Sequence, residues 1–415
     1  MTPIVAIDRE PKDFEITWDL GRRCNFDCTY CADYRHNNTS PHASLETLIK
    51  TSKFVIKYKN LLQTYMYSDR EYIIGFTGGE PTTNPNFLAI CEYMHSLNDP
   101  SITIDLTTNG AFSETYCNKL METVDKTTIS YHCEVDQSIK DTVIDRIYQM
   151  KESNYEYKVN LMVHARPDYF DECIKLLEQF QKDDIQFIPR IIGEDGHKDR
   201  YNHQYTEQQH SWFRNHWNVG NKKKKNNKKK GRKELGRPCC GRREFYTLDE
   251  TTANEMLETE IELKTNNWGK STFACSTEFK EWSCMINWHW LHIEQEYDRI
   301  LHHQTCRANF GGKRGEIGTI TDCDKIIEQL EGQFATGIMP VLVCPNKLCG
   351  CGLCVQKSKH HKITKAMFNT TVKGLTPSIS GLFPQINTTM QDLPNMFEDI
   401  LADSSLSTES IMQPY

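Results

Sequence analysis

The sequence predicts an α/β protein: a parallel β-sheet curled into a partial or full barrel, followed by a smaller cysteine-rich α+β domain. Three observations predict this fold. Short β-branched or aromatic runs alternate with longer amphipathic runs through the first half, the alternation stops near Gly193, and cysteines gather in the part that follows. Alternating strand and helix signals are typical of a parallel sheet with right-handed crossovers.

Six strand–helix units account for the first half of the chain. The expected strands are Phe14–Leu20, Tyr72–Phe76, Thr103–Thr107, Thr127–His132, Tyr157–Val163 and Ile185–Pro189. The expected helices between them lie near Ser44–Lys59, Asn86–Ser96, Glu114–Glu122, Ile139–Ser153 and Tyr169–Gln181. Ligands of such folds collect at the carboxyl ends of the strands, so we expect functional residues just after each strand.

Composition narrows the class of protein. A length of 415 residues suits two or three domains, and no run approaches the ~20 apolar residues of a membrane-spanning helix. The net charge of −7 argues against a protein that binds polyanions with its whole surface. Because Met1–Glu10 contains no apolar signal sequence, we expect a cytoplasmic protein whose 17 cysteines serve metal or redox chemistry rather than disulfides.

The most specific motif follows the first expected strand. Cys24, Cys28 and Cys31 stand in a C-x3-C-x2-C spacing, with the aromatic Tyr30 before the last cysteine. Three thiolates on one short loop can hold three irons of a [4Fe-4S] cluster, whose full ligation normally takes four, so one iron stays open. The alternative is a zinc site with His36 as the fourth ligand.

A second motif, Gly78-Gly79-Glu80, follows the second expected strand. Paired glycines let the backbone approach a ligand closely, and the acidic side chain could bind an ammonium group. A simple strand-to-helix turn would also explain these residues. Further polar residues stand in or after the later strands: Thr108, Asn109, Ser130, Asn160 and Arg190. Turn chemistry at Asn109 and a surface salt bridge at Arg190 are the structural alternatives.

Residues 12–192 together resemble the core of the radical S-adenosylmethionine (SAM) superfamily. The resemblance implies a (β/α)6 partial TIM-like barrel in which the three cysteines hold a [4Fe-4S] cluster and SAM binds its open iron. It assigns Gly78–Glu80 to the amino group of SAM, and it makes the five further polar residues candidate SAM contacts. One electron, from a donor such as flavodoxin or ferredoxin, would cleave SAM to methionine and a 5′-deoxyadenosyl radical that takes hydrogen from a substrate.

The C-terminal cysteines form a third constellation. An expected hairpin begins with the strand Cys284–Ile293, turns at 295–298 and returns to Cys306, and four more cysteines lie between Cys344 and Cys354. This arrangement resembles the twitch or SPASM extension of radical SAM enzymes. The resemblance implies one auxiliary [4Fe-4S] cluster, bound by Cys284, Cys306 and two of Cys344, Cys349 and Cys351.

The extension departs from the full SPASM pattern. SPASM expects C-x2-C-x5-C-x3-C and a further cysteine, whereas this chain has C-x4-C-x-C-x2-C and none after Cys354. One auxiliary cluster is therefore expected rather than two. A ligand set that uses Cys306 with Cys323 stays open, as does a structural zinc site.

The expected organisation is a core over 1–192, a polar Lys/Asn-rich linker or insertion over 193–240, a cysteine-rich domain over 241–358 and a C-terminal tail over 359–415. We interpret the lysine-rich run at 221–233 as a solvated loop, with a phosphate or nucleic-acid contact as the alternative.

The sequence therefore predicts a radical SAM enzyme. Peptide or protein modification is the commonest activity among the enzymes whose extensions it resembles, so we rank that substrate class first. Oxidation or rearrangement of a small molecule or nucleotide is the second hypothesis. A third, from a different class, is a non-catalytic zinc-binding protein that contacts RNA, which leaves Gly78–Glu80 without a purpose. No general acid or base can be singled out, because the many histidines and tyrosines follow no distinguishing pattern.

Overall fold

The structure is a computed structural model. It describes residues 4–7, 13–31, 36–65, 70–192, 205–216, 245–248, 280–284, 286–303, 309–310, 313–314, 316–339, 341–344, 357–358 and 363–364.

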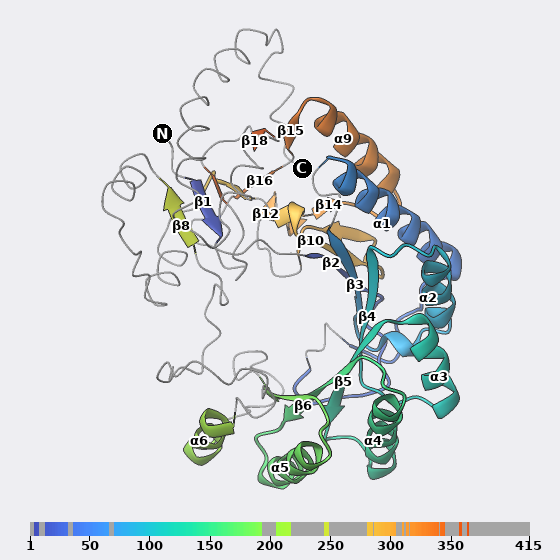
Figure 1. Ribbon diagram of the computed structural model, residues 1–415, viewed down its shortest axis with the longest axis vertical. Helices are drawn as coiled ribbons and strands as arrows, with labels where there is room; N and C mark the ends of the chain where they lie inside the picture. Colours follow the sequence, from blue (N-terminus) through green and yellow to red (C-terminus); the bar gives the residue numbers. More distant parts are fainter. Residues whose placement is uncertain are drawn as a thin grey trace.

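A nine-stranded sheet organises the fold, with strand order β14-β11-β10-β2-β3-β4-β5-β6-β7. Its central part confirms the predicted α/β class, because β2 to β7 are six consecutive parallel strands. Their bounds are Asp13–Asp19 (β2), Glu71–Thr77 (β3), Ile102–Thr108 (β4), Lys126–His132 (β5), Tyr157–Val163 (β6) and Phe187–Ile191 (β7). Figure 1 shows these strands following a curved, open arc with helices along its outer side.

Alternation within the strands separates the core from the barrel interior. In β2, Phe14, Ile16 and Trp18 are buried, and the residues between them are at least partly exposed. The buried set packs outward: the ring of Phe14 lies 5.9 Å from that of Tyr58 on the first helix, and Trp18 lies 5.1 Å from Phe76. Side chains of one strand alternate between the two faces of its sheet, so the other set lines the inside of the arc, where a ligand can reach it.

Helices cover the outer face of the sheet. They are Leu45–Tyr65 (α1), Phe87–Ser96 (α2), Glu114–Thr123 (α3), Gln137–Glu152 (α4), Pro167–Lys182 (α5), Glu207–His216 (α6) and Cys323–Ala335 (α9), with 3-10 turns at Pro81–Thr83 (η1) and Ile286–Trp288 (η2). No helix in these described ranges combines the length and hydropathy that crossing a bilayer requires.

Two predicted boundaries shift for local reasons. Helix α5 begins at Pro167 rather than Tyr169, since proline is favoured in the first turn of a helix. Strand β7 begins at Phe187 rather than Ile185, because the chain leaves α5 through a left-handed residue, Asp184, and the amide of Ile185 still donates to the carbonyl of Phe180 at 2.9 Å.

Helix α6 lies within the stretch that the sequence predicts to be a polar linker. Phe213 on this helix is fully buried, with its ring 6.3 Å from Phe170 on α5 and 5.5 Å from Tyr205. This part of the stretch is therefore packed on the barrel, which the polar composition of residues 193–240 does not indicate. The lysine-rich run at 221–233 lies outside the described residues.

The C-terminal region extends the same sheet. Strand β10 (Trp290–Glu294) pairs in parallel with β2, and β11 (Arg299–Leu301) and β14 (Glu316–Gly318) continue the sheet by antiparallel pairing. The predicted turn at 295–298 is present between β10 and β11. The expected strand Cys284–Ile293 is interrupted by η2, and Thr305–Arg307 lies outside the described residues.

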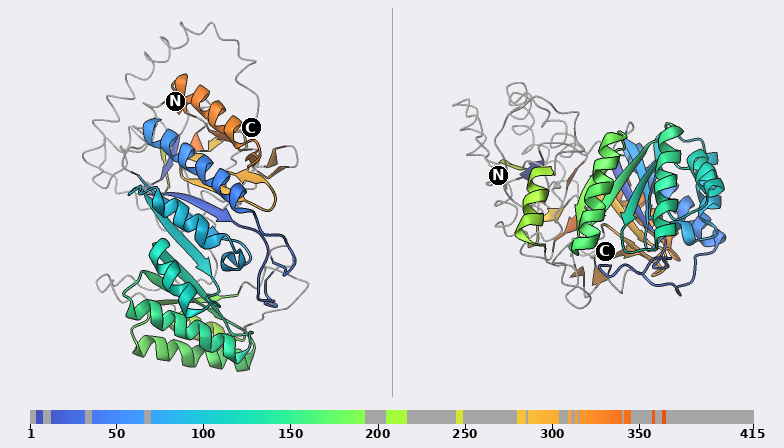
Figure 2. Two further views of the ribbon diagram at one scale, coloured as in Figure 1. Left: turned by 90° about the vertical axis from the view of Figure 1, so that its right-hand side faces the viewer. Right: turned by 90° about the horizontal axis from the view of Figure 1, so that it is seen from below.

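The remaining strands form small sheets. They are Ile4–Ile7 (β1), Phe245–Leu248 (β8), Ser283–Cys284 (β9), Leu342–Val343 (β16) and Lys357–Ser358 (β17) in one sheet, Asn309–Phe310 (β12) with Lys313–Arg314 (β13), and Ile338–Met339 (β15) with Ile363–Thr364 (β18). Helix α9 lies beside α1 in Figures 1 and 2, and stacked rings of Tyr65 and Phe334, 4.8 Å apart, join the two helices.

Burial of His302, directly after β11, predicts acid sensitivity. Burial lowers the pKa of His302 to about 4, below the value of about 6.5 that an unfolded chain gives histidine. Between these values the unfolded state binds more protons, so this histidine contributes stability above pH ~6.5 that is lost as the pH falls towards 4. The loss is at most about 1.4 kcal/mol per pH unit.

We therefore expect His302→Leu to flatten the fall in urea-unfolding midpoint between pH 7 and pH 5. The same substitution at the exposed His95 is the matched control and should leave the slope unchanged. Equal slopes in wild type and His302→Leu would contradict the assignment.

Candidate active site

The three cysteines of the first motif share one cavity at the carboxyl ends of the strands. Cys28 is buried, and Cys24 and Cys31 are half-buried. The cavity has a volume of about 280 Å³. It is lined by Cys24, Phe26, Cys28, Tyr30, Cys31, His36, Thr77, Gly78, Gly79, Glu80, Thr107, Thr108, Asn109, Ser130 and His132. The structure thus brings the cysteine loop together with six of the eight predicted cofactor-contact residues: Gly78, Gly79, Glu80, Thr108, Asn109 and Ser130.

The glycine pair lets the turn after β3 touch the cysteine loop. The amide of Gly79 donates to the carbonyl of Gly21 at 2.7 Å, and that of Glu80 to the carbonyl of Arg23 at 2.8 Å. A Cβ atom on Gly79 would lie 2.4 Å from two carbonyl oxygens of the loop, which real Cβ atoms do not tolerate. Gly78 has φ +136°, a backbone conformation that favours glycine. A plain strand-to-helix turn would need neither feature.

Glu80 ties this turn to the end of β4. Its buried carboxylate accepts from the Thr108 hydroxyl at 2.7 Å, from the Asn109 amide at 2.6 Å and from the amide and hydroxyl of Thr82 at 3.0 and 2.6 Å. Burial raises the pKa of Glu80, although these hydrogen bonds oppose the shift. Only one of the four described donors reaches Oε2, so this oxygen retains acceptor capacity for an ammonium group.

The remaining predicted residues continue along β5 to β7. The side-chain amide of Asn109 donates to Asn25 in the cysteine loop at 2.7 Å. Ser130 stands opposite Asn160 in the register of β5 and β6. Arg190 on β7 donates through Nε to the Asn160 side chain at 3.0 Å. Asn160 and Arg190 lie outside the cavity lining, one and two strands beyond Ser130.

Sequence reasoning missed a cluster beside Cys28. The ring of His132 stacks on Tyr30 at 5.9 Å, and its Nδ1 lies 3.5 Å from the Cys28 sulfur. Glu134 accepts from the Thr29 amide at 2.8 Å. His132 ends β5 and Glu134 follows it, so the rule that places ligands after strand ends could have singled them out.

Burial sets the protonation of this cluster. It lowers the pKa of His132 to about 4, so the imidazole is neutral at neutral pH. It also raises the pKa of Cys24 to about 11 and that of Cys28 to about 12. The free thiols are therefore protonated, and a metal that bound them would displace those protons.

Two of the predicted auxiliary ligands lie near one another, Cys284 in β9 and Cys344 directly after the adjacent strand β16. Cys284 in β9 pairs with Leu342 in β16, and the Cys344 amide donates to the carbonyl of Trp282 at 2.8 Å. Cys344 is thus two residues beyond Leu342, the cross-strand partner of Cys284. Side chains in such a diagonal pair on one face lie about 7–8 Å apart. Cys306, Cys349 and Cys351 lie outside the described residues.

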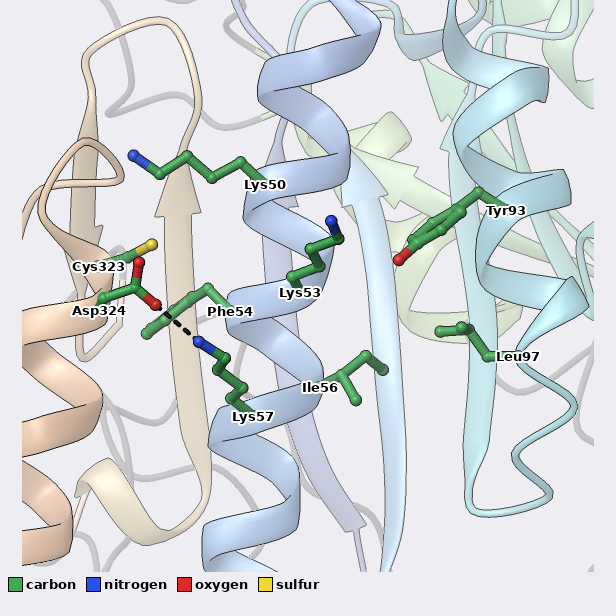
Figure 3. Close-up of a pocket in the computed structure, with 9 residues that line it drawn as sticks. All are labelled: Lys50, Lys53, Phe54, Ile56, Lys57, Tyr93, Leu97, Cys323 and Asp324. Carbon is green, nitrogen blue, oxygen red and sulfur yellow. Dashed lines mark hydrogen bonds and ion pairs between the residues drawn. The ribbon is translucent and has the colours of Figure 1, made fainter.

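Cys323, which the alternative ligand set combines with Cys306, lies in a different part of the fold. It begins α9 and lines a cavity of about 320 Å³ between α1, α2 and α9. Figure 3 shows its sulfur directed towards α1, beside the ion pair of Lys57 and Asp324 at 2.8 Å. This cavity lies on the helical outer side of the sheet, whereas Cys284 lies in a small separate sheet and Cys344 directly follows one of its strands.

The fold and the cavity define an α/β partial-barrel protein with three thiols beside a glycine-rich turn. Residues 18–185 match the family described as Radical SAM superfamily. The matched segment contains the three cysteines and the Gly-Gly-Glu turn.

Solved structures similar to the chain include two of anSMEcpe. "Native anSMEcpe with bound AdoMet" is 16% identical with a TM-score of 0.45, over 75% of this chain and 80% of that one. "Native anSMEcpe with bound AdoMet and Kp18Cys peptide" is 16% identical with a TM-score of 0.42, over 75% and 79%. A structure of BtrN in complex with AdoMet and 2-DOIA is 18% identical with a TM-score of 0.23, over 31% and 55%. No curated protein sequence matches the chain.

The contact of Gly79 with the loop carbonyls predicts that Gly79→Ala is costly. We expect a destabilisation of about 1–3 kcal/mol, typical of overpacking, together with weaker SAM binding, because the cysteine loop and the turn must move apart. Urea unfolding and calorimetric titration with SAM measure the two effects. Gly75→Ala, on the same strand, is the matched control, since its Cβ would meet only the Ile16 carbonyl at 3.8 Å. Wild-type SAM affinity in Gly79→Ala would contradict this geometry.

Proposed function

We propose that Cys24, Cys28 and Cys31 hold the [4Fe-4S] cluster of a radical SAM enzyme and that Gly78–Glu80 receive the amino end of SAM. The single observation that carries the proposal is that the three thiols and this turn line one cavity. The Gly-Gly-Glu turn alone is a weak signal, and its position beside the three thiols strengthens it. Their convergence from positions about fifty residues apart in the sequence is what a site for a cluster and its bound cosubstrate requires.

The donor set fits the proposed cluster. Three cysteine sulfurs face one cavity, whereas a protein-ligated cluster normally takes four thiolates, so one iron is left for SAM. When bound and reduced, the cluster supplies the electron that cleaves SAM to methionine and a 5′-deoxyadenosyl radical. The protein's own task is to bind, orient and shield these groups.

The polar side chains of the cavity suit that task. Glu80 Oε2 offers an acceptor to the SAM ammonium, and Thr108, Asn109 and Ser130 provide hydroxyl and amide groups to the rest of the molecule. We place Arg190 opposite the SAM carboxylate, where its guanidinium could make a forked contact after exchanging its bond with Asn160. The aromatic rings of Phe26 and Tyr30 wall the cavity and limit the access of water.

The proposed reaction is hydrogen abstraction from a peptide or protein, the substrate class that the resemblance to twitch and SPASM enzymes puts first. A small molecule or nucleotide is the second candidate class.

An auxiliary [4Fe-4S] cluster is proposed at Cys284, Cys306 and two of Cys344, Cys349 and Cys351. Its support is that Cys284 lies in β9 and Cys344 directly follows the adjacent strand β16. An auxiliary cluster there would bind substrate or carry away an electron.

Iron and acid-labile sulfide counts after anaerobic reconstitution test both cluster assignments. We expect about eight irons per chain, the content of two four-iron clusters. Cys28→Ala should lose about four irons and all formation of 5′-deoxyadenosine from SAM and dithionite. Cys284→Ala should lose about four irons and keep that formation.

Cys91→Ala is the matched control, because this buried core cysteine on α2 lies outside the cavity. It should keep all of its iron at a stability cost of about 1 kcal/mol. Four irons in the wild type would reassign the C-terminal cysteines to zinc or substrate contacts. Zinc without iron would favour the non-catalytic zinc-binding alternative and end the radical SAM assignment.

Isotope transfer tests the substrate class. A deuterium-labelled cell extract, separated by size, should pass deuterium into 5′-deoxyadenosine from its peptide and protein fraction, because the radical takes a substrate hydrogen. Protease treatment of that fraction should remove the signal, and heat treatment alone should not. Transfer from the small-molecule fraction instead would select the second candidate class.

A further inference from the structure

The turn between β10 and β11 is hydrogen-bonded to the cysteine loop through one carboxylate. Glu296 accepts from the Arg22 amide at 2.7 Å and from the Arg22 guanidinium at 2.6 and 2.9 Å. It also accepts from the Ser40 hydroxyl at 2.9 Å. Its side chain is 11% exposed, and 274 residues separate it from Arg22. Hydrogen bonds between charged partners are stronger than neutral ones, so this is a firm contact.

These contacts join the two ends of the loop. Arg22 precedes Cys24, and Ser40 follows Cys31. Between these ends, the Cys24 amide donates to the carbonyl of Asn37 at 2.7 Å and the Asn37 amide donates to that of Arg22 at 2.9 Å. Glu296 thus closes a loop whose base is already paired, and it fixes that base to the C-terminal hairpin.

The same loop base carries the turn proposed to bind SAM. The carbonyls of Gly21 and Arg23 accept from the amides of Gly79 and Glu80. A shift of Arg22 would therefore move a cluster cysteine on one side and the Gly-Gly-Glu turn on the other.

The hairpin itself is held rigidly, so Glu296 has a fixed position. The amide of the preceding residue, Gln295, donates to the carbonyl of Asp19 at 2.8 Å. The Gln295 side chain accepts from the buried Trp18 indole at 3.0 Å and from the Thr51 hydroxyl at 3.1 Å. The turn is thus anchored to β2 and to α1 before its carboxylate reaches the loop.

We propose that Glu296 is a positioning residue through which the C-terminal hairpin sets the geometry of the cysteine loop and of the SAM-binding turn. The expected effect on SAM binding rests on the proposed function, whereas the contact between Glu296 and the cysteine loop does not depend on it. The role of the C-terminal region then includes completing the N-terminal site, besides any auxiliary cluster of its own.

Hydrogen–deuterium exchange of Glu296→Gln tests the positioning directly. The substituted amide keeps the shape but loses the charge and one acceptor. We expect exchange over residues 21–40 to quicken roughly tenfold or more, because charged hydrogen bonds protect the amide of Arg22 and the loop base. SAM affinity, measured by titration of the reconstituted enzyme, should fall by a similar factor, and the EPR signal of the reduced N-terminal cluster should lose its wild-type response to SAM.

Glu294→Gln is the matched control. It makes the same chemical change on the same hairpin, but the carboxylate of Glu294 contacts Arg299 and His292 rather than the cysteine loop. Exchange over residues 21–40 and SAM affinity should stay at wild-type values. If Glu296→Gln does not fold, Ser40→Ala removes a single donor and should still quicken exchange at the loop base.

The outcomes separate this inference from the proposed function. Wild-type exchange and SAM affinity in a folded Glu296→Gln protein would overturn the positioning role while leaving the cluster assignment intact. Faster loop exchange in a protein whose wild type binds no iron would support the positioning contact and overturn the cluster assignment. Faster exchange with unchanged SAM affinity and EPR response would reduce Glu296 to a structural residue and also overturn the proposal.

Discussion

The close approach of two backbone segments is the constraint on which the site depends. The amides of residues 79 and 80, after β3, donate to the carbonyls of residues 21 and 23 in the cysteine loop, at a separation that only glycine permits at position 79. This contact sets the position of Cys24, which directly follows it. The buried Glu80 carboxylate then extends the contact to β4 through Thr108 and Asn109. The candidate site is thus assembled mainly from main-chain geometry, and the side chains adapt it to charge.

The arrangement explains why the chemistry can occupy the mouth of the barrel. The outward residues of β2 and β3 are large and fully buried against helices, so they carry the core. The inward residues do not form part of this core and can therefore be polar. Burial around the cavity keeps His132 neutral and raises the pKa values of the cysteine thiols. A low-dielectric cavity of this kind favours ligands that arrive with their own compensating charge, as SAM and an iron-sulfur cluster would.

The sequence predicts what depends on local pattern. The six parallel strands, the cysteine loop and the Gly-Gly-Glu turn were all visible, because strand alternation, ligand spacing and paired glycines are short-range signals. It does not predict that β10 joins the barrel sheet beside β2, since parallel pairing between residues 275 positions apart leaves no local trace. Glu296 was missed for the same reason: a single glutamate in a hairpin turn looks like any solvated charge. The edges of α5 and β7 shifted because proline and a left-handed residue decide them.

Continuity of the sheet changes what the C-terminal region is. As a separate domain it would touch the barrel through a surface, and its cysteines would act at a distance. As part of the sheet, β10 pairs with β2, and Glu296 in the turn after β10 holds the loop of Cys24. The strand is buried and the hydrogen bonds from the Arg22 guanidinium are charged, so a displacement of the hairpin would also move the base of the loop.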